Sequence, residues 1–134
     1  MDSQEAARRW AATWTVAWQT HDVESVVELY AEDCVHRSTP FRLPHHQRRG
    51  VRDYVTQAFA DEQRIHEVGF GTPVVQGDRA WVEYWAGFLD THDTAMTLAG
   101  CAMARFAADG RITEARDYRQ LEHGHRPPPQ EWGR

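Results

Sequence analysis

One carboxylate stands out as a group that could transfer protons. Asp117 lies in residues 112–120, a stretch with the composition of a strand. Strand alternation puts Ala115 and Arg119 on the same face as Asp117. If this face lines an apolar pocket, burial disfavours the charged carboxylate and prepares it for acid–base work. The alternative is a structural ion pair between Asp117 and Arg116 or Arg119.

Two other strand residues could supply similar chemistry. Glu83 shares a face with Trp85 in residues 80–89, and two carboxylates with separated pKa values would form an acid–base pair. The alternative for Glu83 is an ion pair with an arginine across the sheet. His36 lies in the short strand 34–38, and an imidazole titrates near neutral pH. The alternative is that His36 is an ordinary core or rim residue.

The sequence also supplies the aromatic walls that a pocket needs. It contains six tryptophans, and large rigid apolar side chains build either a core or a pocket wall. Four aromatic residues should face the sheet from predicted helices: Trp14, Trp18, Tyr54 and Phe59.

No pattern in the chain predicts a metal or a cofactor. There is no H-E-x-x-H motif, no G-x-S-x-G elbow and no glycine-rich phosphate loop. The paired histidines 45–46 and the tail histidines 123 and 125 lie in a predicted loop and tail. Cys34 and Cys101 are expected to be reduced, unpaired and buried.

Composition describes an ordinary globular chain of one-domain size. The 134 residues are 41% hydrophobic and 26% charged, with a formal net charge of −5. A nucleic-acid partner would need a basic surface, so none is expected. The apolar run 98–104 is too short to span a membrane. Without a recognisable signal peptide, the sequence predicts a cytoplasmic protein.

Helical periodicity dominates the first half of the chain. Apolar residues recur every three or four positions from Ser3 to Gln19, again in 23–30, and again from Gly50 to Phe59. The second half alternates as strands, over 65–75, 80–89, 95–106 and 112–120. Helices followed by meandering strands predict an α+β fold with the helices on one face of a curved antiparallel sheet.

We expect one domain over residues 1–122 and a proline-rich tail over 123–134. The tail contains three consecutive prolines, 127–129, which favour an extended conformation with no core of its own. It should therefore be dispensable for folding.

Four stretches carry a family resemblance when taken in order: AWQTHDVESVVELYAEDCV, GVRDYVTQAF, GDRAWVEYW and DGRITEARDY. Together they resemble the nuclear transport factor 2-like superfamily, particularly its SnoaL-like bacterial branch. Relatives there include polyketide cyclases, limonene epoxide hydrolases and ketosteroid isomerases. The resemblance covers about residues 4 to 121 and implies a cone-shaped α+β barrel around one apolar pocket.

The resemblance bears on Asp117 in two ways. DGRITEARDY is similar to the last strand of the limonene epoxide hydrolases, whose R-D-Y aspartate belongs to an Asp–Arg–Asp triad. The earlier strand that carries the other two triad members has no arginine or aspartate in residues 83–87 here, which argues against epoxide hydrolysis. Aspartate-based polyketide cyclases also place an acid–base carboxylate in the cone, so the resemblance still implies this role for Asp117.

These observations lead to one functional hypothesis and two alternatives. The hypothesis is a cofactor-independent isomerase, cyclase or dehydratase, with Asp117 transferring protons on an apolar carbonyl-bearing or polycyclic substrate. A non-catalytic ligand-binding domain and a dimeric interaction module with a filled cone are the alternatives. Strands that are apolar on both faces predict a homodimer through the sheet, since one face would otherwise lie in water.

Overall fold

The computed structural model describes residues 1–134 and contains three helices. They are α1 (Ser3–Thr20), α2 (Val23–Val27) and α3 (Gln47–Asp61). Helix α1 begins where the Asp2 side chain accepts a 2.8 Å hydrogen bond from the Glu5 backbone. It ends at His21, which has a positive φ of 55°. None of these helices has the length and apolar character needed to cross a membrane.

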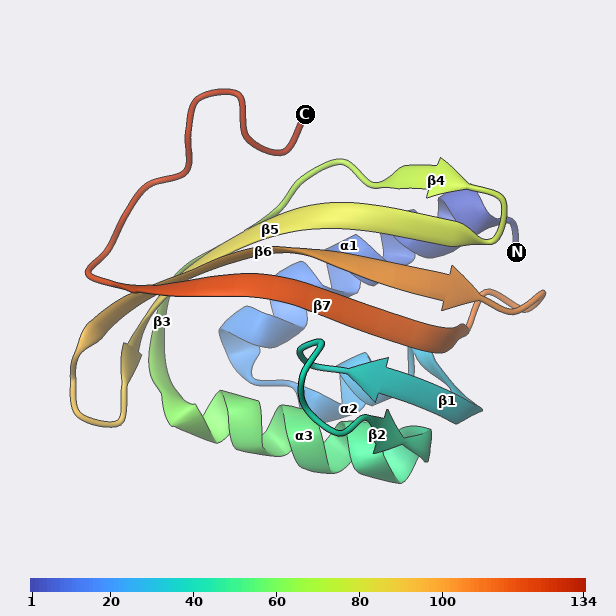
Figure 1. Ribbon diagram of the computed structural model, residues 1–134, viewed down its shortest axis with the longest axis horizontal. Helices are drawn as coiled ribbons and strands as arrows, with labels where there is room; N and C mark the ends of the chain where they lie inside the picture. The colour runs from blue at the N-terminus through green and yellow to red at the C-terminus, as the bar shows by residue number, and fades with distance from the viewer.

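Seven strands form one sheet in the order β2-β1-β7-β6-β5-β3, with β4 paired to β5. They are β1 (Tyr30–Arg37), β2 (His45–His46), β3 (Glu62–Phe70), β4 (Val74–Gln76), β5 (Arg79–Asp90), β6 (Ala95–Phe106) and β7 (Ile112–His123). Every pairing is antiparallel except that of β1 with β7, which is parallel. The sheet is curved and does not close (Figure 1).

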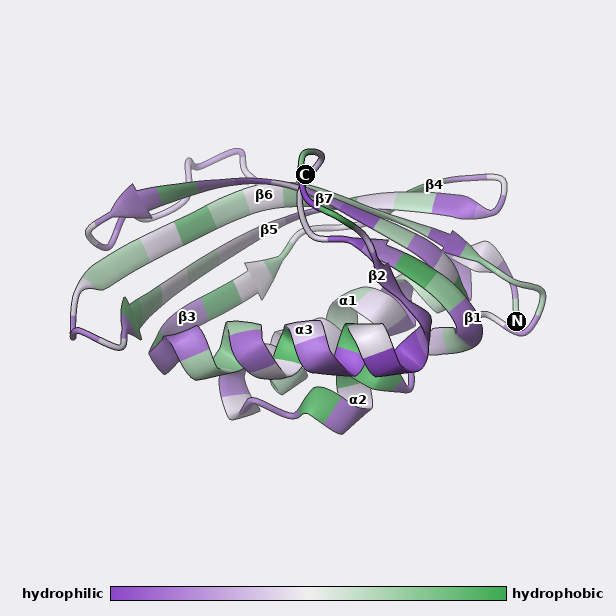
Figure 2. Ribbon diagram, turned by 60° about the horizontal axis from the view of Figure 1, so that its bottom comes forward, coloured by the Kyte–Doolittle hydropathy of each residue, from purple (hydrophilic) through white to green (hydrophobic).

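The predicted α+β class is confirmed, with all three helices on the concave side of the sheet (Figure 2). The core lies between these two layers. Alternate residues of β5, Val82, Tyr84, Ala86 and Phe88, are all buried there. Val51, Val55 and Phe59 face them from α3, at the helical spacing that the sequence indicated.

Several element boundaries differ from the sequence prediction. Residues 45–46, expected in a loop, form β2, and the expected strand 65–75 is β3 followed by β4. The second helix stops at Val27, and Tyr30 already belongs to β1. The helix ends there because the Ile112 backbone N–H donates a 2.8 Å hydrogen bond to the Leu29 carbonyl. This bond pairs the chain with β7 from Tyr30 onward. Helix α3 begins at Gln47, earlier than the expected Gly50.

The tail, residues 124–134, lies against the sheet. It turns back over the convex face, opposite the helices (Figures 1 and 2). The Trp85 indole donates a 2.7 Å hydrogen bond to the Arg126 carbonyl, and the Trp132 ring packs edge-on against Trp85 at 6.0 Å. The Thr72 backbone N–H donates to the Gly133 carbonyl at 3.0 Å. The apolar ring of Trp85 and its indole N–H thus form a surface on which the tail docks.

Candidate functional site

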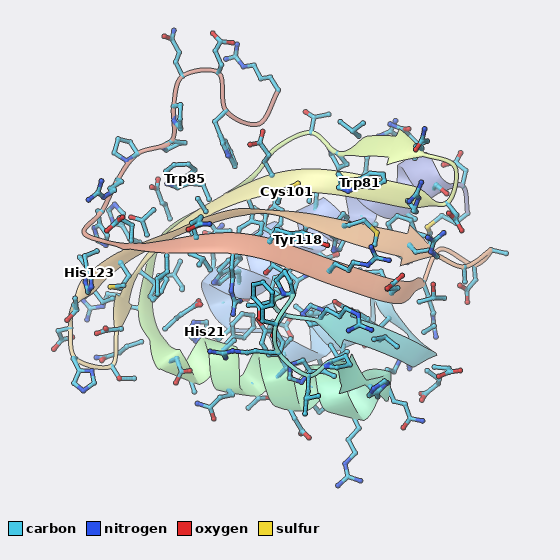
Figure 3. All side chains as sticks on the ribbon, viewed as in Figure 1. His21, Trp81, Trp85, Cys101, Tyr118 and His123 are labelled. Carbon is cyan, nitrogen blue, oxygen red and sulfur yellow. The ribbon has the colours of Figure 1, made fainter.

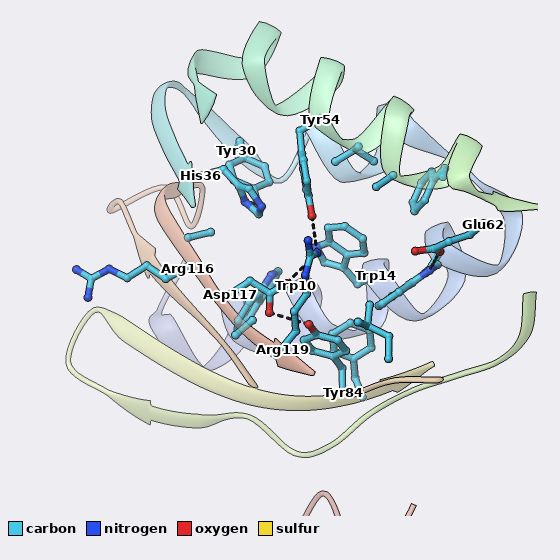
Figure 4. Close-up of a pocket in the computed structure, with 18 residues that line it drawn as sticks. Trp10, Trp14, Tyr30, His36, Tyr54, Glu62, Tyr84, Arg116, Asp117 and Arg119 are labelled. Atoms are coloured by element: carbon cyan, nitrogen blue, oxygen red, sulfur yellow. Dashed lines mark hydrogen bonds and ion pairs between the residues drawn. The ribbon is translucent and has the colours of Figure 1, made fainter. Parts of the chain in front are cut away.

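A cavity of about 70 Å³ lies between the helices and the concave face of the sheet (Figure 4). Thirteen of the eighteen residues that line it are hydrophobic, which is the composition expected of a small-molecule site. The polar remainder comes from several elements and includes His36, Glu62, Asp117 and Arg119. We call this space the inner cavity.

A wider hollow of about 670 Å³ adjoins it and is lined by α3, the ends of β5 and β6, and the loop before β2. We call it the outer hollow. Five residues line both spaces and are named the neck: Tyr54, Ala58, Glu62, Leu98 and Arg119. The neck thus includes two ionisable side chains, Glu62 and Arg119.

Asp117 lies on the wall of the inner cavity, as its place on β7 predicts. Its side chain is only 16% exposed. Burial raises the pKa of Asp117 to about 6, although a hydrogen bond from Tyr84 and the nearby positive charge of Arg119 oppose the shift. The closest Arg119 nitrogen is 3.8 Å from Asp117 Oδ2, too far for a good charge-assisted hydrogen bond. Desolvation therefore outweighs the ion pair.

Tyr84 reaches Asp117 from two strands away. Its hydroxyl donates a 2.7 Å hydrogen bond to Asp117 Oδ1 across β6. Gly100, the register partner of Tyr84, makes this path possible. A Cβ built at Gly100 would lie 2.7 Å from the Tyr84 hydroxyl oxygen, so any larger residue would displace the phenol.

Arg119 links the sheet to α3 at the neck. Its Nη1 donates a 2.8 Å hydrogen bond to the Tyr54 hydroxyl. Figure 4 shows this contact on the opposite side of Arg119 from Asp117. The guanidinium is thus held between a carboxylate and a phenol, where it can orient a polar ligand group entering from the hollow.

His36 is buried and kept neutral. Burial, aided by the positive charges of His45 and Arg119, lowers the pKa of His36 to about 3. Its Nδ1 is 2.9 Å from the Tyr30 hydroxyl. The Nε2 atom is buried and has no hydrogen-bond partner in the protein. His36 therefore contributes a neutral imidazole to the cavity wall.

Glu62 is a carboxyl group that the sequence analysis did not single out. It is the first residue of β3 and is 8% exposed. The Trp18 indole donates a 2.5 Å hydrogen bond to its Oε1. Burial raises the pKa of Glu62 to about 7, against the opposing effects of Trp18 and Arg119.

The apolar walls come chiefly from α1 and α3. Trp10, Trp14 and Trp18, spaced four residues apart on α1, line the inner cavity, and Phe59 of α3 joins them. Trp14 packs edge-on against both Trp18 and Phe59. Edge-on packing is a favourable arrangement of aromatic rings, so these side chains form a packed apolar wall on this side.

The structure places Glu83 and Trp85 outside the cavity, which corrects the expectation that they line it. Both lie on the convex face, where the Gly133 backbone N–H donates to Glu83 Oε1 at 3.3 Å. The side chains of β5 that point inward are the uncharged ones that alternate with Glu83 and Trp85, and they include Val82 and Tyr84. Figure 3 labels Trp85 beneath the returning tail and Trp81 further along the same strand, near β4.

The structure thus brings seven of the nine predicted site residues to one cavity: Trp14, Trp18, His36, Tyr54, Phe59, Asp117 and Arg119. Sequence reasoning missed Glu62, Tyr84 and Tyr30. Nothing in the structure groups three metal-ligating side chains. Cys34 and Cys101 are both free, but only Cys34 is buried as expected, whereas Cys101 is half-buried.

Comparison with known proteins matches this chain to one family. The model of the SnoaL-like domain matches residues 7–115. Among curated proteins, none has a sequence significantly similar to this chain.

Two solved structures share the fold. One is a hypothetical protein with a ketosteroid isomerase-like fold from Catenulispora acidiphila, in complex with trimethylamine. Its TM-score is 0.70 at 18% identity, over 80% of this chain and 82% of that chain. The other is an NTF2-like protein of unknown function from an Exiguobacterium species. Its TM-score is 0.70 at 15% identity, over 86% of this chain and 98% of that chain.

Proposed function

We propose that this chain, which belongs to the SnoaL-like domain family, is an acid–base enzyme that needs no cofactor. Its substrate is an apolar carbonyl-bearing or polycyclic molecule, and Asp117 is the group that transfers protons. Only the reactive end of such a molecule would enter the inner cavity of about 70 Å³, while its body would lie in the outer hollow of about 670 Å³. The reaction is an isomerisation, cyclisation or dehydration, each of which moves a proton at a carbon activated by a neighbouring oxygen.

One observation carries this proposal: a buried carboxyl on an apolar cavity wall whose pKa is raised to about 6. A general base works best when its pKa lies near the operating pH. An ordinary surface aspartate is a much weaker base, and a tightly ion-paired one would be weaker still. Asp117 is therefore placed where proton abstraction from carbon is feasible.

The neighbouring groups support the same chemistry. The Tyr84 hydroxyl fixes one Asp117 oxygen and leaves the other to accept a proton. The neutral imidazole of His36 also lines this cavity. The guanidinium of Arg119 lines it too, and a fixed positive charge could stabilise negative charge that develops on a substrate oxygen.

The alternative is a ligand-binding domain without catalysis. The mostly hydrophobic inner cavity favours it equally, since apolar walls bind a ligand whether or not a reaction follows. In that case Asp117 would only anchor a polar group. Turnover separates the two functions, while binding alone does not.

The test uses β-tetralone, a bicyclic ketone with exchangeable hydrogens next to its carbonyl. Deuterium uptake from D2O is followed by NMR with wild type and Asp117→Asn, and quenching of tryptophan fluorescence reports binding. The variant should bind the ketone and exchange about 10²–10⁴-fold more slowly. If wild type binds the ketone but does not exchange its hydrogens, the catalytic proposal fails and the ligand-binding alternative stands.

We also propose that the chain forms a homodimer through the convex face of the sheet. Tyr118 is 50% exposed there, and Cys101 is its register partner on β6. A second copy is the simplest partner for such a face.

A further inference from the structure

Glu62 is a buried acid without a basic partner. Only 8% of the residue is exposed, and buried charges in proteins are normally paired. Its one side-chain hydrogen bond is the one that the Trp18 indole donates to Oε1 at 2.5 Å. Its second oxygen, Oε2, has no hydrogen-bond partner and is not sealed inside the protein. Because the carboxyl points into the pocket (Figure 4), Oε2 is open to a group that enters there.

The arginines of the inner cavity do not supply the missing positive charge. Arg119 lies 3.8 Å from Asp117 Oδ2, which is its ion-pair partner. Arg116 forms two hydrogen bonds with Glu114, of 3.1 and 3.2 Å. When Asp117 and Glu62 are both ionised, Arg119 can balance only one of them. The cavity is then short of one positive charge, and a ligand could supply it.

The outer hollow has the same excess of negative charge. Two arginines, Arg42 and Arg119, lie on its lining. Burial lowers the pKa of His45, which also lies there, and so favours its neutral form. Four carboxyl groups oppose the two arginines: Asp53, Asp61, Glu62 and Asp90. A positively charged group is therefore attracted to the hollow, and beyond it to the neck, where Glu62 lies.

We propose that the pocket takes a ligand with a protonated amine, and that Glu62 binds the ammonium group at the neck through Oε2. The inference rests on the proposed function for its site, and it names the substrate class as a cationic amine with an apolar body. An ammonium N–H donates a strong, charge-assisted hydrogen bond to a carboxylate. The amine is assigned to Glu62 rather than to Asp117, because Asp117 already has the guanidinium of Arg119 near it.

The aromatic surroundings favour an organic cation. Trp14, Trp18 and Phe59 line the same cavity as Glu62, and the faces of aromatic rings attract ammonium groups. The rings also offer apolar contact to the carbon atoms next to the nitrogen. A metal ion prefers oxygen, nitrogen or sulfur ligands, which the faces of these rings do not provide.

Binding of the amine should also change the charge of Glu62. The ionisable groups near Glu62 are Arg119 of β7, Asp61 and Tyr54 of α3, and its register partner Asp90 of β5. Burial outweighs the positive charge of Arg119 and raises the pKa of Glu62 to about 7. An ammonium group in contact with the carboxyl favours its ionised form and lowers this pKa. Near neutral pH, the amine is therefore bound as an ion pair, and the fraction of Glu62 that was protonated releases its proton.

The test compares two bicyclic probes that differ in the group on one carbon. One is 2-aminotetralin, which is protonated at neutral pH, and the other is the uncharged ketone β-tetralone. Quenching of tryptophan fluorescence gives the Kd of each probe slightly above neutral pH, where Glu62 is mostly ionised. Wild type should bind the amine about 10- to 10²-fold more tightly than the ketone, the range expected for a hydrogen bond between charged groups.

The decisive variant is Glu62→Gln. It removes the charge and keeps the contact with Trp18, because an amide oxygen also accepts a hydrogen bond. This variant should lose the preference for the amine and bind the ketone as wild type does. Glu67→Gln removes a charge at an exposed position of the same strand. It is the matched control for general attraction of cations to an acidic protein, and it should keep the preference.

Two results would overturn the inference: equal affinity of wild type for the two probes, or a preference for the amine that survives in Glu62→Gln. If Glu62→Gln does not fold, the carboxyl carbon of Glu62 is titrated by NMR in wild type. A pKa that 2-aminotetralin leaves unchanged would then overturn the inference. If the amine binds through Glu62 but the ketone is not exchanged, the inference stands and the proposed reaction fails. If wild type binds neither probe, both fail.

Discussion

The Tyr84 hydroxyl crosses strand β6 above Gly100 and donates a 2.7 Å hydrogen bond to Asp117 Oδ1. This bond stabilises the charged carboxylate and opposes the effect of burial on its pKa. Tyr84→Phe should therefore raise the pKa of Asp117 further and move the acid limb of the exchange profile to higher pH. Gly100→Ala is not an equivalent test, because its methyl group would also lie 2.6 Å from the Tyr118 backbone oxygen and strain the sheet next to Asp117. An unchanged acid limb in Tyr84→Phe would show that the bond does not tune Asp117.

Stability should depend on pH through Asp117 in an unusual direction. Folding raises its pKa from 3.8 to about 6, so the native state holds the proton more tightly than the unfolded chain. The stabilisation of the fold by protonated Asp117 is complete below the pKa of the unfolded chain. It is lost as pH rises from there to about 6. Between about pH 3 and pH 8, wild type should lose about 3 kcal/mol relative to Asp117→Asn.

Wild type must be compared with Asp117→Asn because His36 changes the stability of the fold with pH in the opposite direction. Its pKa is lowered on folding, so the native state loses stability as pH falls through the unfolded value. That contribution is present in both proteins and cancels in the difference. Urea unfolding at a series of pH values gives the result, and a constant difference would contradict the raised pKa of Asp117.

Strand alternation was enough to find the centre of the site. On β7 it put Ala115, Asp117 and Arg119 on one face, and all three line the inner cavity. On β5 the same rule left two aromatic faces to choose between. Within the predicted span 80–89, the face that carries Val82 and Tyr84 has no charged residue, whereas the other includes Glu83. The wholly uncharged set turns inward, and this signal could have corrected the choice.

Glu62 could not be found in the same way. It follows Asp61 and precedes Gln63 and Arg64, a polar run that is typical of an exposed helix end. Its burial depends on the approach of Trp18 from α1, a tertiary contact that local periodicity does not report. The docking of the tail on Trp85 is another long-range contact that the proline-rich composition concealed.

Removal of residues 124–134 should destabilise the protein, contrary to what the sequence suggested. The tail contributes the contacts of Trp132 with Trp85 and of Gly133 with Thr72. Truncation after His123 should lower the melting temperature by more than about 5 °C, and Trp132→Ala should account for part of the loss. Gln130→Ala, at an exposed position, is the control. A truncated chain that melts like wild type would mean that the tail does not stay docked.

The proposed dimer predicts a particle of twice the 15.5 kDa chain mass at micromolar concentration. Tyr118 lies on the convex face of the sheet (Figure 3). Tyr118→Glu should dissociate the dimer, since two charges would meet across a C2 interface. The melting temperature of the dissociated chain should fall. Light scattering that reports the single-chain mass for wild type would refute the dimer.

The central claim is that the fold places Asp117 in an apolar cavity and tunes it for proton transfer near neutral pH. The direct measurement is an NMR titration of the Asp117 carboxyl carbon, assigned by comparison with Asp117→Asn. The expected pKa is about 6, because burial outweighs the contacts with Tyr84 and Arg119. A pKa at or below the ordinary value of 3.8 would show that Asp117 is a structural ion-pair partner and would contradict the proposed role.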